Sequence, residues 1–194
     1  AESLSKHEGD LLLNGLTSLS DAAAESLGGH TGWLSIVGLT SLSDAAVESL
    51  SKHQGRLELD RLTSLSEAAA ESLGQHDSFL SLNGLTSLSD AAAESLSKHR
   101  GGLGLRQLTE FKDGEGHVAL AESLSNHAGN LCLNGVTSLP DAAAESLGKH
   151  KGPLWLNGLT SLSDAAAESL GKHQGYQLNL NGLTNLSDAA VESL

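Results

Sequence analysis

Short alternations of leucine with other residues recur along the chain and predict β-strands. In a strand, successive side chains point to opposite faces, so both leucines of each Leu-x-Leu motif lie on the same face. A strand this short is stable only within a larger sheet. The motifs begin at Leu11, Leu34, Leu57, Leu80, Leu103, Leu131, Leu154 and Leu178.

A second pattern follows each predicted strand and indicates a short helix. In residues 42–53, apolar residues recur four positions apart, so one stripe of the helix can face the strand layer. Ser43 stands where an N-cap is expected, and Asp44 follows in the first turn, where the helix dipole favours a carboxylate. Gly55 lies just past the expected end of the helix. Each unit is therefore predicted to contain one strand and one helix.

The unit of strand and helix repeats with a period of 23 residues, as the motifs at Leu34, Leu57 and Leu80 show. A fixed period of this size is typical of a solenoid, in which each unit packs on its neighbours. We therefore predict a single α/β repeat array over residues 1–194, with eight repeats. The chain starts and stops inside a unit, so we expect it to be a fragment of a longer polypeptide.

The pattern LxLxxLxxL, followed by a helical second half, resembles the bacterial leucine-rich repeat. This resemblance implies a right-handed leucine-rich-repeat-like solenoid, with a parallel β-sheet on the concave side and short helices on the convex side. A bacterial origin and an extracellular or cell-envelope location rest on the resemblance alone.

One position departs from the common leucine-rich pattern. Where most such repeats carry an inward asparagine, this chain has leucine, for example Leu16 and Leu39. Asparagine stands two positions earlier instead, where it either forms a ladder between repeats or ends the strand in a turn. These asparagines are Asn14, Asn83, Asn134, Asn157 and Asn181.

Charge and composition exclude several classes of partner. The chain has 11 Lys and Arg against 24 Asp and Glu, a formal net charge of -13. Nucleic acids require a basic surface, so we expect no nucleic-acid partner. No apolar run approaches the ~20 residues of a membrane-spanning helix. The single cysteine, Cys132, has no partner for an internal disulfide.

Polar residues that recur in every unit are expected to be structural. A histidine follows each predicted helix, where it either meets the last helix carbonyls or belongs to a metal-binding row. Threonine recurs between two inward leucines, and we expect local backbone hydrogen bonding there rather than an ice-binding face. Glu2 precedes Lys6 and Glu48 precedes Lys52 by four residues, which predicts solvated ion pairs.

The outward side of the strands varies from repeat to repeat, unlike the rest of the unit. Variation on a uniform scaffold is typical of a recognition surface, and Trp, Phe and Arg often anchor protein interfaces. Drift at solvent-exposed positions is the alternative explanation. The candidate binding residues are Trp33, Ser35, Arg56, Glu58, Asp60, Phe79, Ser81, Arg106, Trp155 and Asn157.

The fifth repeat carries five extra residues, 112–116, which we expect to form a surface loop at the turn between strand and helix. Glycines within this segment permit tight turns. The alternative is therefore that Asp113, Glu115 and His117 converge on a cation.

The sequence contains no nucleophile elbow, phosphate loop or EF-hand-like loop. We therefore expect a protein that is not an enzyme, uses no cofactor and has no small-molecule ligand. Its expected function is that of a scaffold that binds a protein partner through the variable strand face. The alternative is a structural protein that self-associates end to end.

Overall fold

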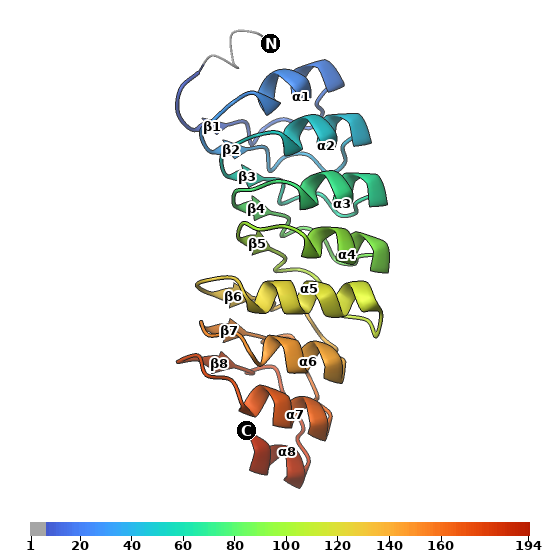
Figure 1. Cartoon of the computed structure of the whole chain (residues 1–194), viewed down its shortest axis with the longest axis vertical. Helices are drawn as coiled ribbons and strands as arrows, with labels where there is room; N and C mark the ends of the chain where they lie inside the picture. The colour runs from blue at the N-terminus through green and yellow to red at the C-terminus, as the bar shows by residue number, and fades with distance from the viewer. Residues whose placement is uncertain (1–6) are drawn as a thin grey trace.

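The structure is a computed structural model that describes residues 7–194, and its units of strand and helix are stacked along one axis (Figure 1). The strands are β1 (Leu11–Leu12), β2 (Leu34–Ser35), β3 (Leu57–Glu58), β4 (Leu80–Ser81), β5 (Leu103–Gly104), β6 (Leu131–Cys132), β7 (Leu154–Trp155) and β8 (Leu178–Asn179). The helices are α1 (Asp21–Gly28), α2 (Asp44–Ser51), α3 (Glu67–Gly74), α4 (Asp90–Ser97), α5 (Glu115–Ser125), α6 (Asp141–Leu147), α7 (Asp164–Gly171) and α8 (Asp188–Ser193). The predicted α/β repeat solenoid is confirmed.

The strands pair in parallel, and equivalent leucines lie opposite each other. Leu34 pairs with Leu57, and Leu57 pairs with Leu80, so the register follows the sequence period. The strands form two sheets instead of one continuous sheet, with the orders β1-β2-β3-β4-β5 and β6-β7-β8. The break between β5 and β6 falls at the repeat with the insertion.

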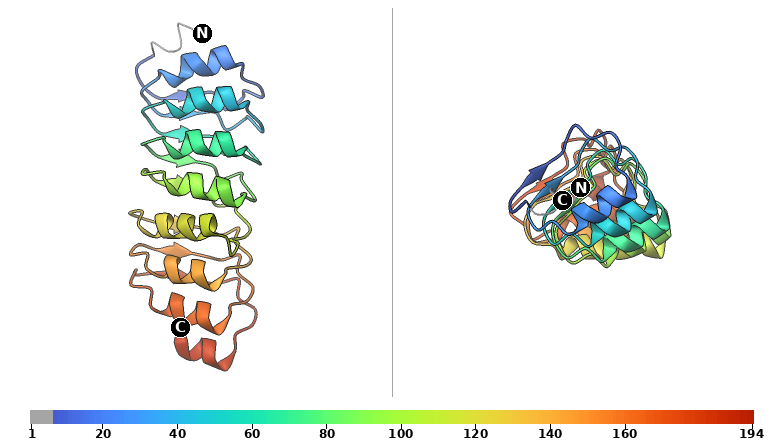
Figure 2. Two further views of the ribbon diagram at one scale, coloured as in Figure 1. Left: turned by 45° about the vertical axis from the view of Figure 1, so that its right-hand side comes forward. Right: turned by 90° about the horizontal axis from the view of Figure 1, so that it is seen from above.

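The apolar core lies between the strand layer and the helices. Leu57 and Leu59 of the β3 motif are fully buried, as are Ala46 and Leu50 on α2. Viewed from one end in Figure 2, the strands and the helices occupy opposite sides of the stack. The strand side is the shallow concave side of the array (Figure 1). Burial of leucines from both layers stabilises the stack, at about 25 cal/mol for each Å² of apolar surface removed from water.

The helix starts follow the prediction and add a contact between repeats. The Ser43 hydroxyl accepts a hydrogen bond from the Ala46 N–H at 3.1 Å, and Asp44 lies in the first turn. The same hydroxyl donates to Asp21 of the preceding helix at 2.5 Å. Each such serine therefore caps its own helix and joins it to the one before. Equivalent bonds run from Ser66 to Asp44, from Ser163 to Asp141 and from Ser187 to Asp164.

Two further rows of side chains connect successive repeats. The Thr109 hydroxyl donates to the Thr86 carbonyl at 2.9 Å, and Thr137 donates in the same way to Thr109 at 3.1 Å. The predicted local hydrogen bonding is therefore wrong for these threonines, because the backbone acceptor belongs to the preceding repeat. The Asn157 N–H donates to Asn134 Oδ1 at 3.2 Å, so the asparagines form a ladder between repeats.

Gly55 is required by the close approach of two repeats. A Cβ atom at this position would lie 2.1 Å from the carbonyl oxygen of Gly32 in the preceding repeat. Among residues 7–194, positive φ angles occur only at Gly9 and Gly129, so Gly55 does not end its helix through a left-handed conformation.

The fifth repeat departs from the others at its helix. The expected loop 112–116 is wrong in part, because its last two residues begin α5, which has 11 residues. Gly114 at the N-cap has no side chain to bond the first N–H groups of the helix. Asp90 of α4 supplies the acceptor instead. Its Oδ1 accepts hydrogen bonds from the Gly116 N–H at 3.0 Å and from the His117 N–H at 3.2 Å. The insertion is absorbed partly by a longer helix.

The remaining expectations concern charge and membranes. Glu48 and Lys52 form the predicted exposed ion pair, with 3.2 Å between Oε1 and Nζ. The expected pair of Glu2 and Lys6 lies outside the described residues. No helix within residues 7–194 combines the length and the apolar character needed to cross a membrane.

Candidate binding groove at the break in the sheet

The groove arises where the hydrogen-bond ladder between strands stops. Between β4 and β5, the Leu80 N–H donates to the Gly102 carbonyl at 2.9 Å. The ladder resumes between β6 and β7, where the Leu131 N–H donates to the Pro153 carbonyl at 2.9 Å. In the described part of the chain, β5 and β6 are not paired with each other. The strand layer is therefore open at this point.

The two repeats come together again beyond the strands. The Gly135 N–H donates to the Arg106 carbonyl at 2.8 Å, and the Thr137 N–H donates to the Thr109 carbonyl at 2.7 Å. The space between β5 and β6 is therefore a wedge that closes toward the carboxyl ends of the strands.

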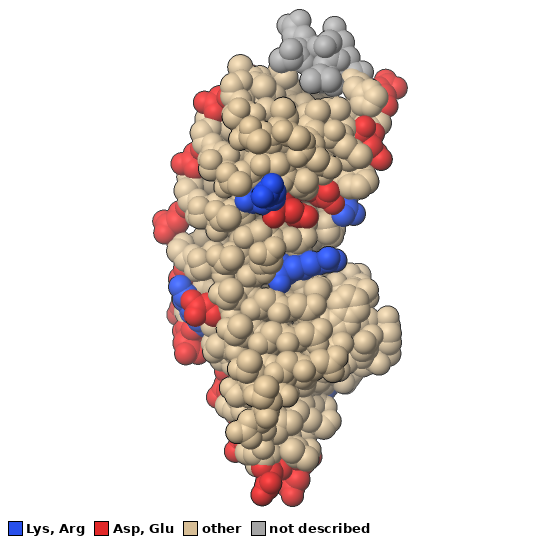
Figure 3. Space-filling view, turned by 180° about the vertical axis from the view of Figure 1, so that it is seen from behind, with Lys and Arg blue, Asp and Glu red and all other residues tan. Residues whose placement is uncertain are grey.

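The strand face at this wedge is hollowed into a groove of about 330 Å³. Figure 3, which views the molecule from behind, shows a notch at this level with basic and acidic side chains beside it. The candidate residues that line the groove are Arg56, Glu58, Asp60, Phe79, Ser81 and Arg106. Its other lining residues are Asn83, Leu103, Gly104, Asn130 and Cys132.

Arg56 is the best-fixed cation of the strand face. Its guanidinium carbon lies 5.0 Å from the ring centroid of Trp33 and 4.4 Å from that of Phe79, both within the range of a cation–π interaction. Its Nε also donates to Glu58 Oε1 at 2.9 Å. The Arg56 side chain is 47% exposed and that of Glu58 only 12%. The aromatic rings and the carboxylate therefore hold the cation in place while it still faces solvent.

A polar network continues from this cluster to the edge of the wedge. Asp60 Oδ1 accepts from the Asn83 N–H at 3.3 Å, and Asn83 Oδ1 accepts from the Arg106 N–H at 3.1 Å. The Asn83 side chain also donates to the Ser81 hydroxyl at 2.8 Å. No ion pair in the described part of the chain includes the Arg106 guanidinium, which is exposed.

The outward positions of β5 and of the residue before it carry no side chain of their own. Gly102 and Gly104 stand where other repeats carry outward side chains, and both are half-buried. A Cβ atom at Gly102 would lie 2.8 Å from the Phe79 ring, so this ring occupies the space beside it. Glycine within a strand is typical of a place where another backbone approaches closely.

The structure thus brings together only part of the predicted surface. Trp33 belongs to it through its contact with Arg56. Ser35 is buried and bonded to Asn14 and Glu58, so it is not an accessible contact. Ser81 lines the groove but is also buried, at 2% exposed, and its hydroxyl is bonded to Asn83. Trp155 and Asn157 lie in the following repeats and do not line the groove.

Sequence reasoning missed the side of the groove that β5 and β6 form, namely Leu103, Gly104, Asn130 and Cys132. The five extra residues at 112–116 and the glycines of β5 are the signals from which this side could have been found.

The histidine row lies inside the array. The rings of His30, His53, His76 and His99 are buried and stacked, with centroids 5.6–6.3 Å apart. Burial lowers the pKa of His53 and His99 below its ordinary value, although backbone carbonyls act in the opposite direction. His76 Nδ1 lies 3.3 Å from the Ser51 carbonyl oxygen, so this ring meets the last carbonyl of the preceding helix and not of its own.

The cation site considered at the insertion does not form. His117 is fully buried, with Nε2 at 3.3 Å from the Leu88 carbonyl oxygen and its ring edge-on to Phe111. Asp113 and Glu115 are exposed. Across residues 7–194, no three His, Cys, Asp or Glu side chains gather closely enough to hold a metal ion.

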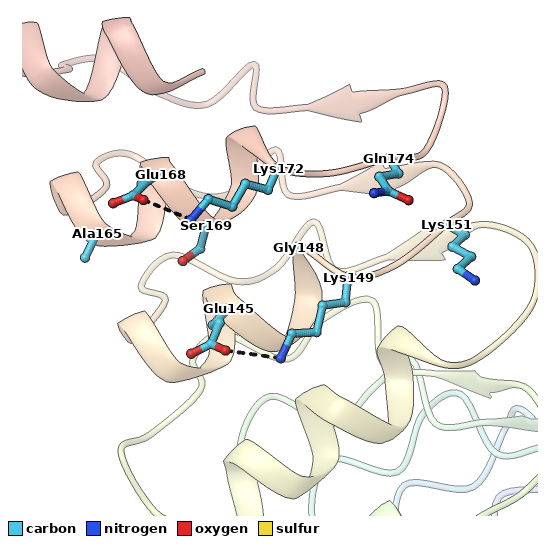
Figure 4. Close-up of a pocket in the computed structure, with 9 residues that line it drawn as sticks. All are labelled: Glu145, Gly148, Lys149, Lys151, Ala165, Glu168, Ser169, Lys172 and Gln174. Atoms are coloured by element: carbon cyan, nitrogen blue, oxygen red, sulfur yellow. Dashed lines mark hydrogen bonds and ion pairs between the residues drawn. The ribbon is translucent and has the colours of Figure 1, made fainter.

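A second hollow, of about 600 Å³, lies on the helix side between α6 and α7 (Figure 4). Its charges are largely paired along each helix, with Lys149 at 3.2 Å from Glu145 and Lys172 at 2.9 Å from Glu168. The hydrogen bond from Lys172 lowers the pKa of the Glu168 carboxyl. Exposed pairs of this kind are typical of a solvated helix surface, so the strand-side groove is the better candidate site.

No protein-family model and no curated protein sequence matches this chain. Its function is therefore inferred from the geometry of the groove and of the strand face around it.

Proposed function

We propose that this chain is a non-catalytic, leucine-rich-repeat-like scaffold that binds a protein partner through the strand face around the groove. The observation that supports this most directly is the cluster of Trp33, Arg56 and Phe79 at the edge of an open backbone wedge. Arginine and aromatic side chains are the usual anchors of protein interfaces. Because Arg56 is already held between two rings, it loses little freedom on binding.

The charges of the groove support a protein partner over a polyanion. Arg56 and Arg106 are accompanied by the carboxylates of Glu58 and Asp60, so the lining has mixed charge. Mixed charges suit a polar protein surface, whereas nucleic acids favour a continuous basic stripe.

Site-specific cross-linking tests which face binds the partner. A photoreactive amino acid is placed at Asn130 in the groove or, as a control, at the exposed Glu71 of α3, and each protein is added to an extract of cells that produce it. We expect one protein to be captured reproducibly from Asn130 and not from Glu71. Equal capture from both positions would contradict the proposal.

Affinity measurements with the captured protein, purified, then test the anchors. Trp33→Ala, Arg56→Ala and Phe79→Ala are each expected to weaken binding by about tenfold or more, as interface anchors do. Lys52→Ala on α2 is the matched control, because it removes an exposed cation from the helix side. Unchanged affinity in all three strand-face variants would exclude this surface.

A second candidate function is structural self-assembly. It is favoured by the contacts between repeats, because the same serine, threonine and asparagine bonds recur along the array. Sedimentation velocity over a hundredfold concentration range tests it. A concentration-independent monomer would exclude self-assembly, whereas a series of growing species would support it.

A further inference from the structure

We propose that the groove binds the C-terminal segment of a partner protein as an added β-strand along β5, with the terminal carboxylate of that segment next to Arg106. This inference rests on the proposed function, because it specifies the chemical form of the protein partner. It follows from the unused backbone groups of the wedge, from the glycines of β5 and from the way in which the wedge closes.

Two backbone N–H groups that face the wedge, one in β5 and one directly after it, have no hydrogen-bond acceptor within residues 7–194. In the preceding repeat, Leu80 and Leu82 donate to the carbonyls of the following strand, both at 2.9 Å. The equivalent donors are Leu103 and Leu105, and no bond joins either of them to the next repeat. Unpaired groups of this kind on a strand edge are a template for another strand.

The opposite wall of the wedge offers the complementary groups. The carbonyls of Pro153 and Trp155 accept the ladder bonds of β6, each at 2.9 Å. By the same register, the carbonyls of Asn130 and Cys132 would accept from β5, but in the described part of the chain these bonds are not made. A single extended peptide in the wedge can therefore accept hydrogen bonds on one side and donate them on the other.

The side chains around β5 leave room for such a peptide. Glycine stands at 102 and 104, where the preceding repeat has Phe79 and Ser81, so the fifth repeat places no side chain of its own at these positions, although the Phe79 ring lies beside Gly102. Natural proteins usually protect edge strands with lysine, proline or a bulge. The segment Leu103–Leu105 contains no lysine or proline, so its open edge is suited to pairing with another strand.

The closed end of the wedge sets the direction and the end of the peptide. A parallel strand would run toward the carboxyl end of β5, where the bond from Gly135 N–H to the Arg106 carbonyl closes the passage. The peptide must therefore terminate there or turn away sharply. The unpaired Arg106 guanidinium lines the groove at this end, and arginine binds carboxylates in a bidentate geometry. A free C-terminus ends the peptide where the passage closes, and it supplies a carboxylate for Arg106.

The test selects ligands from a random library of peptides displayed with free C-termini and then measures the affinity of selected synthetic peptides. We expect selected peptides to bind, and amidation of their C-terminus to weaken binding by about tenfold or more, because it removes the charge that faces Arg106. Equal affinity of the free and amidated forms would overturn the assignment of the carboxylate. Failure to select any ligand would overturn the inference as a whole.

Amide hydrogen exchange distinguishes strand addition from binding elsewhere on the face. Without peptide, the Leu103 and Leu105 amides are expected to exchange faster than those of Leu80 and Leu82, and peptide is expected to slow them. If a peptide binds and the exchange of Leu103 and Leu105 does not change, strand addition is excluded. The proposed function would then still stand, because the face itself would bind protein.

Two variants and a matched control complete the test. Arg106→Gln is expected to abolish the preference for a free carboxylate. Gly104→Val is expected to weaken every selected peptide by about tenfold or more, because the added Cβ would lie 3.0 Å from Asn83 Oδ1, the acceptor of the Arg106 N–H. Asn179→Val makes a similar change at the equivalent strand position of β8, away from the groove, and is expected to bind normally. Normal binding by both groove variants would contradict the inference.

Discussion

Asp90 caps the N-terminus of α5, as a serine caps the N-terminus of most of the other helices. Ser43 and its counterparts bond to N–H groups at the start of their own helices. The N-cap of α5 is Gly114, so the carboxylate of the preceding helix accepts from the first turn instead. Because unbonded N–H groups at a buried helix end are costly, this contact permits the longer helix of the fifth repeat.

Removal of this carboxylate is expected to destabilise the protein. Asp90→Ala should lower the free energy of unfolding by about 1 kcal/mol, since two helix N–H groups lose their acceptor. Glu67→Ala is the control, because Glu67 also lies in a first helix turn but accepts no hydrogen bond from a side chain or helix start within residues 7–194. Urea denaturation measures both. Equal losses would show that Asp90 contributes charge at a helix end and does not act as a cap.

The row of histidines is expected to make one layer of the array sensitive to acid. Burial is the main cause that lowers the pKa of His53, His99 and His127, and neighbouring histidines lower it further. Backbone carbonyls near these rings raise it in part. In the folded protein these rings therefore take up protons only at a lower pH than in the unfolded chain.

This difference fixes the direction of the pH dependence. The unfolded chain binds protons on its histidines from about pH 6.5 downward, before the folded chain does, so stability is full above that pH and falls below it. Urea midpoints between pH 8 and pH 5 are expected to decrease, in a range where carboxylates remain ionised. His53→Gln should show a smaller decrease. A constant midpoint in the unsubstituted protein would contradict the prediction.

The local elements were predictable because a few neighbouring residues determine each of them. Leu57 and Leu59 fix the face of β3, and Ser43 fixes the start of α2. The insertion 112–116 marks the fifth repeat in the sequence, but the loss of pairing between β5 and β6 involves two repeats, which no local pattern describes. His117 illustrates the same limit. The insertion suggested an exposed ligand, but the lengthened helix turns this ring into the core.

The candidate surface was predictable only at the level of strand faces. The alternation of the strand correctly separates outward positions from inward ones, as Arg56 and Phe79 show. It does not show that an outward side chain is covered by its neighbours, as Ser35 is by Asn14 and Glu58. A small outward side chain is therefore buried where longer neighbouring side chains cover it.

On the scale of the whole molecule, the insertion divides one array into two sheets, and its removal is expected to join them. Deletion of 112–116 restores the period of 23 residues, so that Leu131 follows Leu103 at the regular spacing. His117→Ser and Val118→Asp supply the missing N-cap and first-turn carboxylate. We expect a higher Tm, protected amides at Leu103 and Leu105, and loss of peptide binding.

The uncompensated deletion is the control for this design. Without the two substitutions, the helix of the shortened repeat lacks a cap, so the gain in Tm should be smaller. If the amides of Leu103 and Leu105 still exchange rapidly in the compensated variant, the insertion is not the cause of the break.

The bonds that join one repeat to the next have a consequence for how this chain can change in length. Ser66 bonds to Asp44 and Thr109 to Thr86, and every such partner belongs to the adjacent copy of the unit. Duplication or loss of a complete unit therefore leaves each donor with an equivalent acceptor, and the molecule grows or shrinks without new unmatched groups. The insertion 112–116 interrupts the serine row, because Gly114 stands at the N-cap of α5, whereas the threonine row continues from Thr109 to Thr137. Tandem duplication of a unit is thus expected to preserve the stability of this fold. An irregular insertion instead creates a surface, such as the groove, that differs from the repeated surface around it.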